Sequence, residues 1–369
     1  MSSIVVLRIG SLACLALLAQ AASGPTEPGQ SIRQVATMRT ARAAHTATAL
    51  PSGQVLVVGG MADGGGSVAS VELLDPGTNT VQELGSLAER RAGHTATLLG
   101  DGRVLIAGGY NGEYLESLEV FEPSAKRFRP AGSLVEGRSG HTATLLPDGR
   151  VLFVGGVGRG WTFLRSAELY DPRTGRSEPV DPMNVPRESH TATLLADGRV
   201  LVIGGHSGRR QNMAVYASAE LFSSRTRRFD AAGTLATARH KHDAIKLADG
   251  RVLVIGGADR TDRVDYATTE IYSPRTATFE RGPSMANRRY KIAGTSILLP
   301  NGDVLVTSGA RVAELLKLES WTFREVPGRF PAAYRFAAAA PLREGDVIIT
   351  GGYSDGNQNT AAVWRFGQR

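Results

Sequence analysis

The segment Arg91-Ala-Gly-His-Thr-Ala-Thr-Leu-Leu-Gly-Asp-Gly-Arg-Val-Leu-Ile-Ala-Gly-Gly109 is the clearest copy of a unit that occurs seven times in this chain of 369 residues. Its closing glycine pair recurs every 43 to 52 residues. Spacing in this range is typical of propeller blades, which stack because one blade cannot bury its apolar faces alone. The pairs are Gly59-Gly60, Gly108-Gly109, Gly155-Gly156, Gly204-Gly205, Gly256-Gly257, the eroded Ser308-Gly309, and Gly351-Gly352.

Four strands are predicted in each copy from alternation and β-branched content. In the second copy they cover residues 94–99, 104–107, 118–121 and 127–129. The second of these is a nearly unbroken apolar run, which indicates burial on both faces. The fourth is polar and is expected to form the outer edge of the blade.

The two ends of the chain are expected to share one blade. The last copy has strand signals at 335–340, 347–350 and 362–366 and then stops. Residues 31–38 precede the first copy in the way that 81–87 precede the second. We therefore expect an all-β, seven-bladed propeller with four antiparallel strands per blade, in which the N-terminal strand closes the last blade and hides sheet edges.

A secretory signal peptide is expected at residues 1–21, followed by a flexible segment at 22–30 and the propeller at 31–369. Arg8 supplies the positive start, residues 9–18 are largely apolar, and Ala19-Gln20-Ala21 resembles a cleavage site. The apolar run is shorter than the roughly 20 residues that span a membrane. The expected product is a secreted, periplasmic or outer-envelope monomer, with a lipid anchor at Cys14 as the less favoured alternative.

Cysteine content and charge limit the chemistry. Cys14 is the single cysteine, so cleavage after Ala21 would leave no thiol and no disulfide. The chain has 42 Lys and Arg against 35 acids, a net charge of +7 that weakly favours anionic partners. No basic run is interleaved with aromatic residues, so nucleic acid is not an expected partner.

Third-strand motifs carry a family resemblance. Glu72-Leu-Leu-Asp-Pro76, Glu168-Leu-Tyr-Asp-Pro172 and Glu270-Ile-Tyr-Ser-Pro274, together with the glycine pairs, resemble kelch repeats. More narrowly, they are similar to bacterial repeats of the galactose oxidase central-domain type. The resemblance covers about residues 31–369. It is specific for fold but not for function, because kelch propellers serve as oxidases, sugar epimerases and protein-binding platforms.

The resemblance to galactose oxidase implies a copper site that this chain does not match. That family holds copper with Tyr and His ligands and cross-links a tyrosine to a cysteine. The mature chain would contain no cysteine, so a copper radical oxidase is disfavoured. We expect no metal and no cofactor.

Five of the seven histidines begin the first strand of a copy. Imidazoles on innermost strands could converge on a metal in the central channel. The favoured interpretation is structural, with each imidazole hydrogen-bonded between blades, because the histidine recurs with the blade and is replaced in the last two copies, where Gly294 and Ala337 are aligned with it. The five are His45, His94, His141, His190 and His242.

A basic residue precedes the histidine position by three residues in six copies, and an acid recurs in the third strand. The favoured interpretation is a set of buried ion pairs that fix the blades. The alternative is a positive rim that captures a carboxylate or sulfate through bidentate contacts. The basic residues are Arg42, Arg91, Arg138, Arg187, Arg239 and Lys291, and the acids are Glu72, Glu119, Glu168, Glu220, Glu270 and Glu314.

Binding is expected where the copies differ, because scaffold requirements are common to all blades and ligand requirements are not. The loops after the glycine pairs of copies four and five are the longest of the seven, and the sixth is the shortest. Both long loops are polar. The candidate ligand-binding residues are the arginines of these loops and the two histidines that break the repeat pattern, His206 and His240; the arginines are Arg209, Arg210, Arg260 and Arg263.

The favoured function is an exported, non-catalytic platform for a protein or an acidic glycan. Loop aromatics, among them Tyr110, Tyr114 and Trp161, could stack on sugar rings. The alternative is a carbohydrate-active enzyme similar to kelch sialic acid epimerases. In that alternative Arg187 and Arg239 would clamp a carboxylate, and Glu188 or His240 would move a proton.

Overall fold

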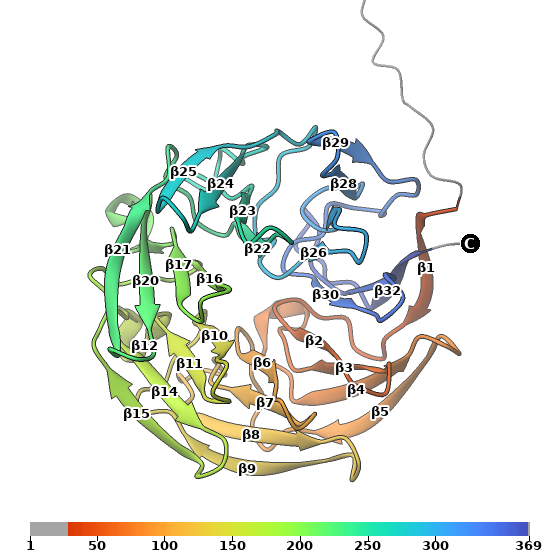
Figure 1. The fold of residues 1–369 in the computed structure, drawn as a ribbon. Coiled ribbons are helices and arrows are strands. Elements are labelled where there is room, and N and C mark those ends of the chain that lie inside the picture. The colour runs from red at the N-terminus through yellow and green to blue at the C-terminus, as the bar shows by residue number, and fades with distance from the viewer. Residues whose placement is uncertain (1–28, 368–369) are drawn as a thin grey trace, which may run out of the picture.

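The computed structural model describes residues 29–367 as a ring of seven four-stranded antiparallel sheets (Figure 1). The predicted fold class is confirmed. The innermost strands surround a central axis, and the outermost strands form the rim. The expected signal peptide lies outside the described residues.

Within each blade the chain runs from the centre to the rim. The first three blades contain β2 (Thr46–Ala49), β3 (Val55–Val58), β4 (Ser70–Asp75) and β5 (Thr80–Ser86); β6 (Thr95–Leu98), β7 (Val104–Ala107), β8 (Ser117–Glu122) and β9 (Arg127–Ser133); and β10 (Thr142–Leu145), β11 (Val151–Val154), β14 (Ala167–Asp171) and β15 (Arg176–Val180). Blades four to six contain β16 (Thr191–Leu194), β17 (Val200–Ile203), β20 (Ser218–Ser223) and β21 (Arg228–Thr234); β22 (Asp243–Lys246), β23 (Val252–Ile255), β24 (Thr269–Ser273) and β25 (Thr278–Arg281); and β26 (Ser296–Leu298), β27 (Val304–Val306), β28 (Glu314–Lys317) and β29 (Thr322–Glu325).

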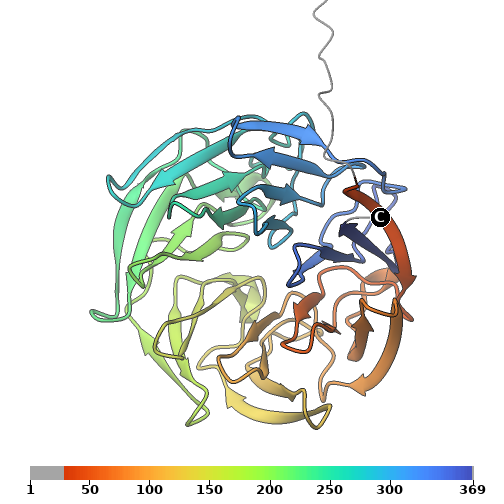
Figure 2. The ribbon, with the colours of Figure 1, turned by 45° about the vertical axis from the view of Figure 1, so that its right-hand side comes forward.

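The seventh blade is closed by the N-terminal strand, as expected. β1 (Ser31–Thr37) pairs antiparallel with β32 (Ala362–Gly367), outside β31 (Val347–Thr350) and the innermost β30 (Ala338–Pro341). The red strand β1 and the dark blue strand β32 meet there in Figures 1 and 2. The first and last strands of the described residues therefore belong to one sheet.

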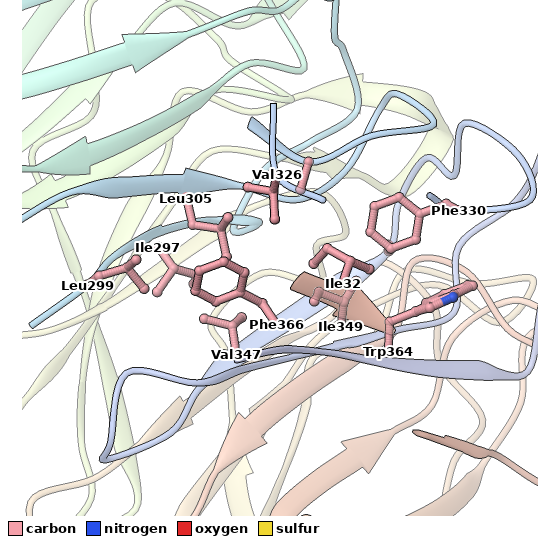
Figure 3. Close-up of a cluster of buried hydrophobic side chains, with 12 residues drawn as sticks. Ile32, Ile297, Leu299, Leu305, Val326, Phe330, Val347, Ile349, Trp364 and Phe366 are labelled. Carbon is pink, nitrogen blue, oxygen red and sulfur yellow. The ribbon is translucent and has the colours of Figure 1, made fainter. Parts of the chain in front are cut away.

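The core consists of seven apolar clusters, one between each pair of neighbouring blades. The second strands are buried along their whole length because both faces of a blade are covered. Between blades six and seven, Ile32 of the closing strand lies with Trp364 and Phe330 (Figure 3). Burying a side chain of this kind stabilises the fold by about 1.5–3 kcal/mol.

The recurring glycine pair is explained by close contacts between blades and within each blade. Gly108 has a φ of +60°, and a Cβ on it would lie 2.6 Å from the Arg138 carbonyl oxygen and 2.9 Å from His141 Cε1 in the next blade. A side chain at this position would therefore push the neighbouring blade away. The first glycine is needed where each blade touches the next, and a Cβ on the second, Gly109, would lie 3.0 Å from the Cβ atoms of Arg91 and His94 at the start of its own blade.

Loops between second and third strands, and those between blades, lie on one side of the ring, named here the loop face. Small elements extend this face: β12 (Val157–Gly158) with β13 (Thr162–Phe163) on blade three, β18 (His206–Ser207) with β19 (Ala214–Val215) on blade four, and the 3₁₀ turns η1 (Asp63–Gly65), η2 (Arg159–Trp161) and η3 (Arg210–Asn212). No helix within residues 29–367 is long and apolar enough to cross a membrane.

Candidate functional site

The repeated arginines are buried inside the blades. Arg138 is 1% exposed, donates to the Glu168 carboxylate at 2.8 Å and to the Gly155 carbonyl oxygen at 2.8 Å. The second carboxylate oxygen of Glu168 accepts from the Val135 backbone N–H in the loop that enters the blade. The structure thus places this set where the ion-pair interpretation expects it. The pairs are Arg42–Glu72, Arg91–Glu119, Arg138–Glu168, Arg187–Glu220, Arg239–Glu270 and Arg289–Glu314, at 2.5–3.0 Å.

The five first-strand histidines link neighbouring blades. His94 Nε2 lies 3.1 Å from Thr46 Oγ1 of the preceding blade, and three other pairs repeat this contact at 3.0–3.1 Å: Thr95–His141, Thr142–His190 and Thr191–His242. Burial, followed by the charge of Arg91, lowers the pKa of His94 to about 3. The imidazoles are therefore neutral at physiological pH, and each one hydrogen-bonds its blade to the preceding blade.

Copy six departs from the alignment expected from the sequence. The ion-pair arginine is Arg289 and not Lys291, and Ile292 occupies the histidine position in place of the expected Gly294. A turn in which the Thr295 N–H donates to the Ile292 carbonyl oxygen delays the first strand to Ser296. The shift of two residues frees Lys291, whose Nζ donates to Tyr353 Oη at 2.5 Å.

Residues directly before the histidine position form a belt around the axis. These residues have positive φ angles, and their backbone N–H groups donate to carbonyl oxygens of the previous blade. The Lys241 N–H donates to the Ser189 carbonyl oxygen at 2.9 Å, and the Lys291 N–H donates to the Lys241 carbonyl oxygen at 2.8 Å. Lys241 is half-buried, and its Nζ lies beside the loops of blades four and five. The first three blades have only Ala44, Gly93 and Gly140 at this position.

The two divergent loops meet around one cavity of about 740 Å³, named here the arginine cavity. Five of the six loop candidates line it, and Lys241 lines it from the belt. The four arginines are exposed, and none has a carboxylate oxygen within 4 Å among the described residues. The lining candidates are His206, Arg209, Arg210, Arg260 and Arg263.

Two buried histidines border the cavity. His206 Nε2 lies 3.0 Å from Glu188, which also lines the cavity, and the His206 and His240 rings are perpendicular with centroids 4.7 Å apart. Burial lowers the pKa of His240, although its Nε2 is 3.2 Å from the Asp262 carboxylate. His240 is the sixth candidate; it is fully buried behind the cavity and does not line it.

Asp262 holds Lys241 in place at the cavity. Its carboxylate accepts from Lys241 Nζ at 2.5 Å and faces His240. Burial raises the pKa of Asp262, but hydrogen bonds from His240 and Lys241 outweigh this effect and keep the pKa well below its ordinary value. Lys241 and Asp262 were missed in the sequence. Lys241 could have been found, because small residues stand in its place in the first four copies.

An aromatic cluster lies next to the cavity. Tyr110, Tyr114 and Trp161 have ring centroids 5.0–5.9 Å apart. Burial raises the pKa of Tyr114 to about 12, so its hydroxyl stays protonated. Arg209 of the cavity stacks on Trp161, with its guanidinium carbon 3.3 Å from the ring centroid.

No protein-family model matches this chain, and no curated protein matches it in sequence. Among solved structures, the fold is similar to a fungal alcohol oxidase of the AA5 family in complex with copper, with a TM-score of 0.71 and 14% sequence identity. The match covers 93% of this chain and 77% of the oxidase chain. At this identity the likeness establishes the fold, consistent with the kelch-type resemblance, and not the activity.

The described residues do not fit the copper centre that this likeness implies. Residues 29–367 contain no cysteine for a cross-link to tyrosine, and no group of three His, Cys, Asp or Glu side chains among them could hold a metal ion. Each histidine Nε2 already faces a hydroxyl, a carboxylate or, for His240, also the Asp259 carbonyl oxygen.

Proposed function

We propose that the protein is exported and acts as a non-catalytic binding platform, which holds an anionic partner in the arginine cavity. One observation carries the proposal. Arg209, Arg210, Arg260 and Arg263 surround one cavity, and none of them is neutralised by a carboxylate within the described part of the chain. Guanidinium groups held close together repel one another, and an incoming anion removes that repulsion.

The chemistry of the lining supports a carboxylate or sulfate ligand. Guanidinium groups bind such anions through paired, charge-assisted hydrogen bonds. The cavity volume of about 740 Å³ falls in the range of about 300–1,000 Å³ typical of ligand sites. An acidic glycan or an acidic protein segment satisfies both conditions.

A catalytic alternative has one observation in its favour: Glu188 and His206 form a carboxylate–imidazole pair at the cavity wall. The arginines expected to clamp the substrate, Arg187 and Arg239, are fully buried in their ion pairs with Glu220 and Glu270. An enzyme would have to use the four cavity arginines instead. Turnover of an acidic sugar that is lost in Glu188→Gln would favour this alternative.

Binding of a galacturonate hexamer and of poly-L-glutamate, measured by calorimetry at low and high salt, tests the proposed function. Arg260→Ala with Arg263→Ala should weaken both by about tenfold for each arginine removed, and added salt should weaken wild-type binding. The matched control is Arg225→Ala with Arg275→Ala, which removes two exposed arginines from the turns between the third and fourth strands of blades four and five. Equal binding by both double variants would contradict the proposal.

A further inference from the structure

The aromatic cluster beside the arginine cavity has no part in the interblade core. Tyr110 and Tyr114 come from the blade-two loop, and Trp161 comes from the blade-three loop. None of the three belongs to an apolar cluster between blades. A scaffold role therefore does not explain why three large rings meet at this place.

Trp161 is exposed and conformationally costly. It is 49% exposed, although Arg209 stacks on its ring. Its φ of +63° is rare for a bulky residue. A bulky residue in this conformation costs stability and is held there by the structure around it.

Arg209 makes the cluster and the cavity one continuous surface. Its guanidinium lies 3.3 Å from the centre of the Trp161 ring and also lines the cavity. A ligand whose anionic group is held by the cavity arginines and that extends across Arg209 therefore reaches Trp161.

We propose that this cluster is a saccharide subsite, and that the ligand of the arginine cavity is an acidic oligosaccharide. This inference rests on the proposed function. One ring of the ligand places its carboxylate among Arg209, Arg210, Arg260 and Arg263, and the adjacent ring packs its C–H face against Trp161. Sugar rings have an apolar face and a polar rim, and an exposed indole matches that pattern. An acidic polypeptide has the charge but no such repeated ring.

Three probes separate ring contacts from charge contacts. A galacturonate hexamer has both rings and carboxylates, its fully methyl-esterified form keeps the rings without the charge, and poly-L-glutamate keeps the charge without the rings. Trp161→Ala should weaken binding of the hexamer by about tenfold and abolish any residual affinity for the ester. The affinity for poly-L-glutamate should stay within about twofold of the wild type. Trp161→Phe should retain most of the affinity for the hexamer.

Trp321→Ala is the matched control, because Trp321 also has a positive φ, of +52°, and an arginine, Arg251, over its ring, but lies at a strand turn. It should bind all probes as the wild type does. Thermal unfolding of Trp161→Ala should remain close to that of the wild type, since the side chain lies outside the core.

The saccharide subsite is overturned if Trp161→Ala binds the hexamer as tightly as the wild type does. It is also overturned if this variant loses affinity for the hexamer and for poly-L-glutamate by the same factor. The second result would mean that Trp161 only positions Arg209. The proposed function fails separately, if Arg260→Ala with Arg263→Ala leaves both anionic probes unaffected. A wild-type protein that binds poly-L-glutamate but not the hexamer would select an acidic protein partner and contradict the subsite.

Discussion

Threonine–histidine hydrogen bonds join most neighbouring blades. At two places one of these residues is replaced, and neighbouring residues supply the contact instead. Where Ile292 replaces the histidine, the preceding blade has Asp243 in place of threonine, and its buried carboxylate accepts from the backbone N–H groups of Gly294, Thr295 and Ser296 at 2.7–3.0 Å. Blades five and six are thus hydrogen-bonded to each other without an imidazole.

The second compensation uses the adjacent strand. Blade seven has Ala338 at the threonine position, and its cross-strand partner Thr350 supplies the hydroxyl, 2.8 Å from His45 Nε2. One contact between blades is therefore preserved by a residue from another strand. Neither replacement could be predicted from one aligned position of the repeat, because the lost residue and the residue that replaces its contact lie on different strands.

Asp243→Ala should destabilise the fold more than Thr191→Ala. The first variant removes three hydrogen bonds to a carboxylate, worth about 1.5–3 kcal/mol each, and the second removes one neutral hydrogen bond worth about 1 kcal/mol. Urea unfolding of the two variants measures the difference. Equal losses would show that the Asp243 contacts contribute little.

Acid should unfold the protein through its buried histidines. Burial lowers the pKa of His45, His94 and His190 to about 3, and that of His141 and His242 well below 6.5. Below pH 6.5 the unfolded chain takes up protons that the folded chain cannot, so the free energy of unfolding falls as the pH falls toward 3. Each neutral histidine contributes about 1.4 kcal/mol per pH unit.

Unfolding in urea between pH 7.5 and 4.5 measures this slope. His94→Gln should reduce the slope by the share of one histidine, because one group that titrates only in the unfolded state is removed. A variant slope identical to that of the wild type would refute this explanation of acid sensitivity.

At the scale of the structural element, the loop that enters each blade is fixed by a buried ion pair. Arg138→Ala would leave the Glu168 carboxylate buried and uncompensated, which costs about 3–5 kcal/mol. Arg150→Ala is the matched control, since the Arg150–Asp148 pair is partly exposed and worth about 0–1 kcal/mol. Thermal unfolding should separate the two variants clearly, and similar melting temperatures would contradict a structural role for Arg138.

The strands could be predicted because their pattern repeats, whereas the loop contacts could not. The apolar run at Val104–Ala107 predicts a strand buried on both faces, and the paired glycines at 108–109 mark close contacts of the backbone. Arg209 and Arg260 were found because their loops break the repeat. Their convergence depends on the radius and twist of the ring, and the stacking of Arg209 on Trp161 joins loops from different blades, so no local pattern records it.

At the scale of the whole molecule, the ring depends on the pairing of β1 with β32. Removing residues up to 37 would expose the edge of β32 and delete Ile32 from the core, and the loss of Ile32 alone costs about 1.5–3 kcal/mol. A chain that starts at Gly29 is the control and should unfold as the full chain does. We expect the shorter chain to melt earlier and to associate, as measured by calorimetry and light scattering. An unchanged monomer would mean that closure is dispensable.

The loop face is the surface on which recognition is proposed, and the opposite face carries the strand turns. Hydrogen–deuterium exchange with and without the galacturonate hexamer tests this division most directly. We expect slower exchange in residues 206–216 and 258–266, around the arginine cavity, and a smaller effect near Trp161. Protection confined to the turns of the opposite face, such as 51–54 and 342–346, or no protection at hexamer concentrations that saturate binding, would contradict the account.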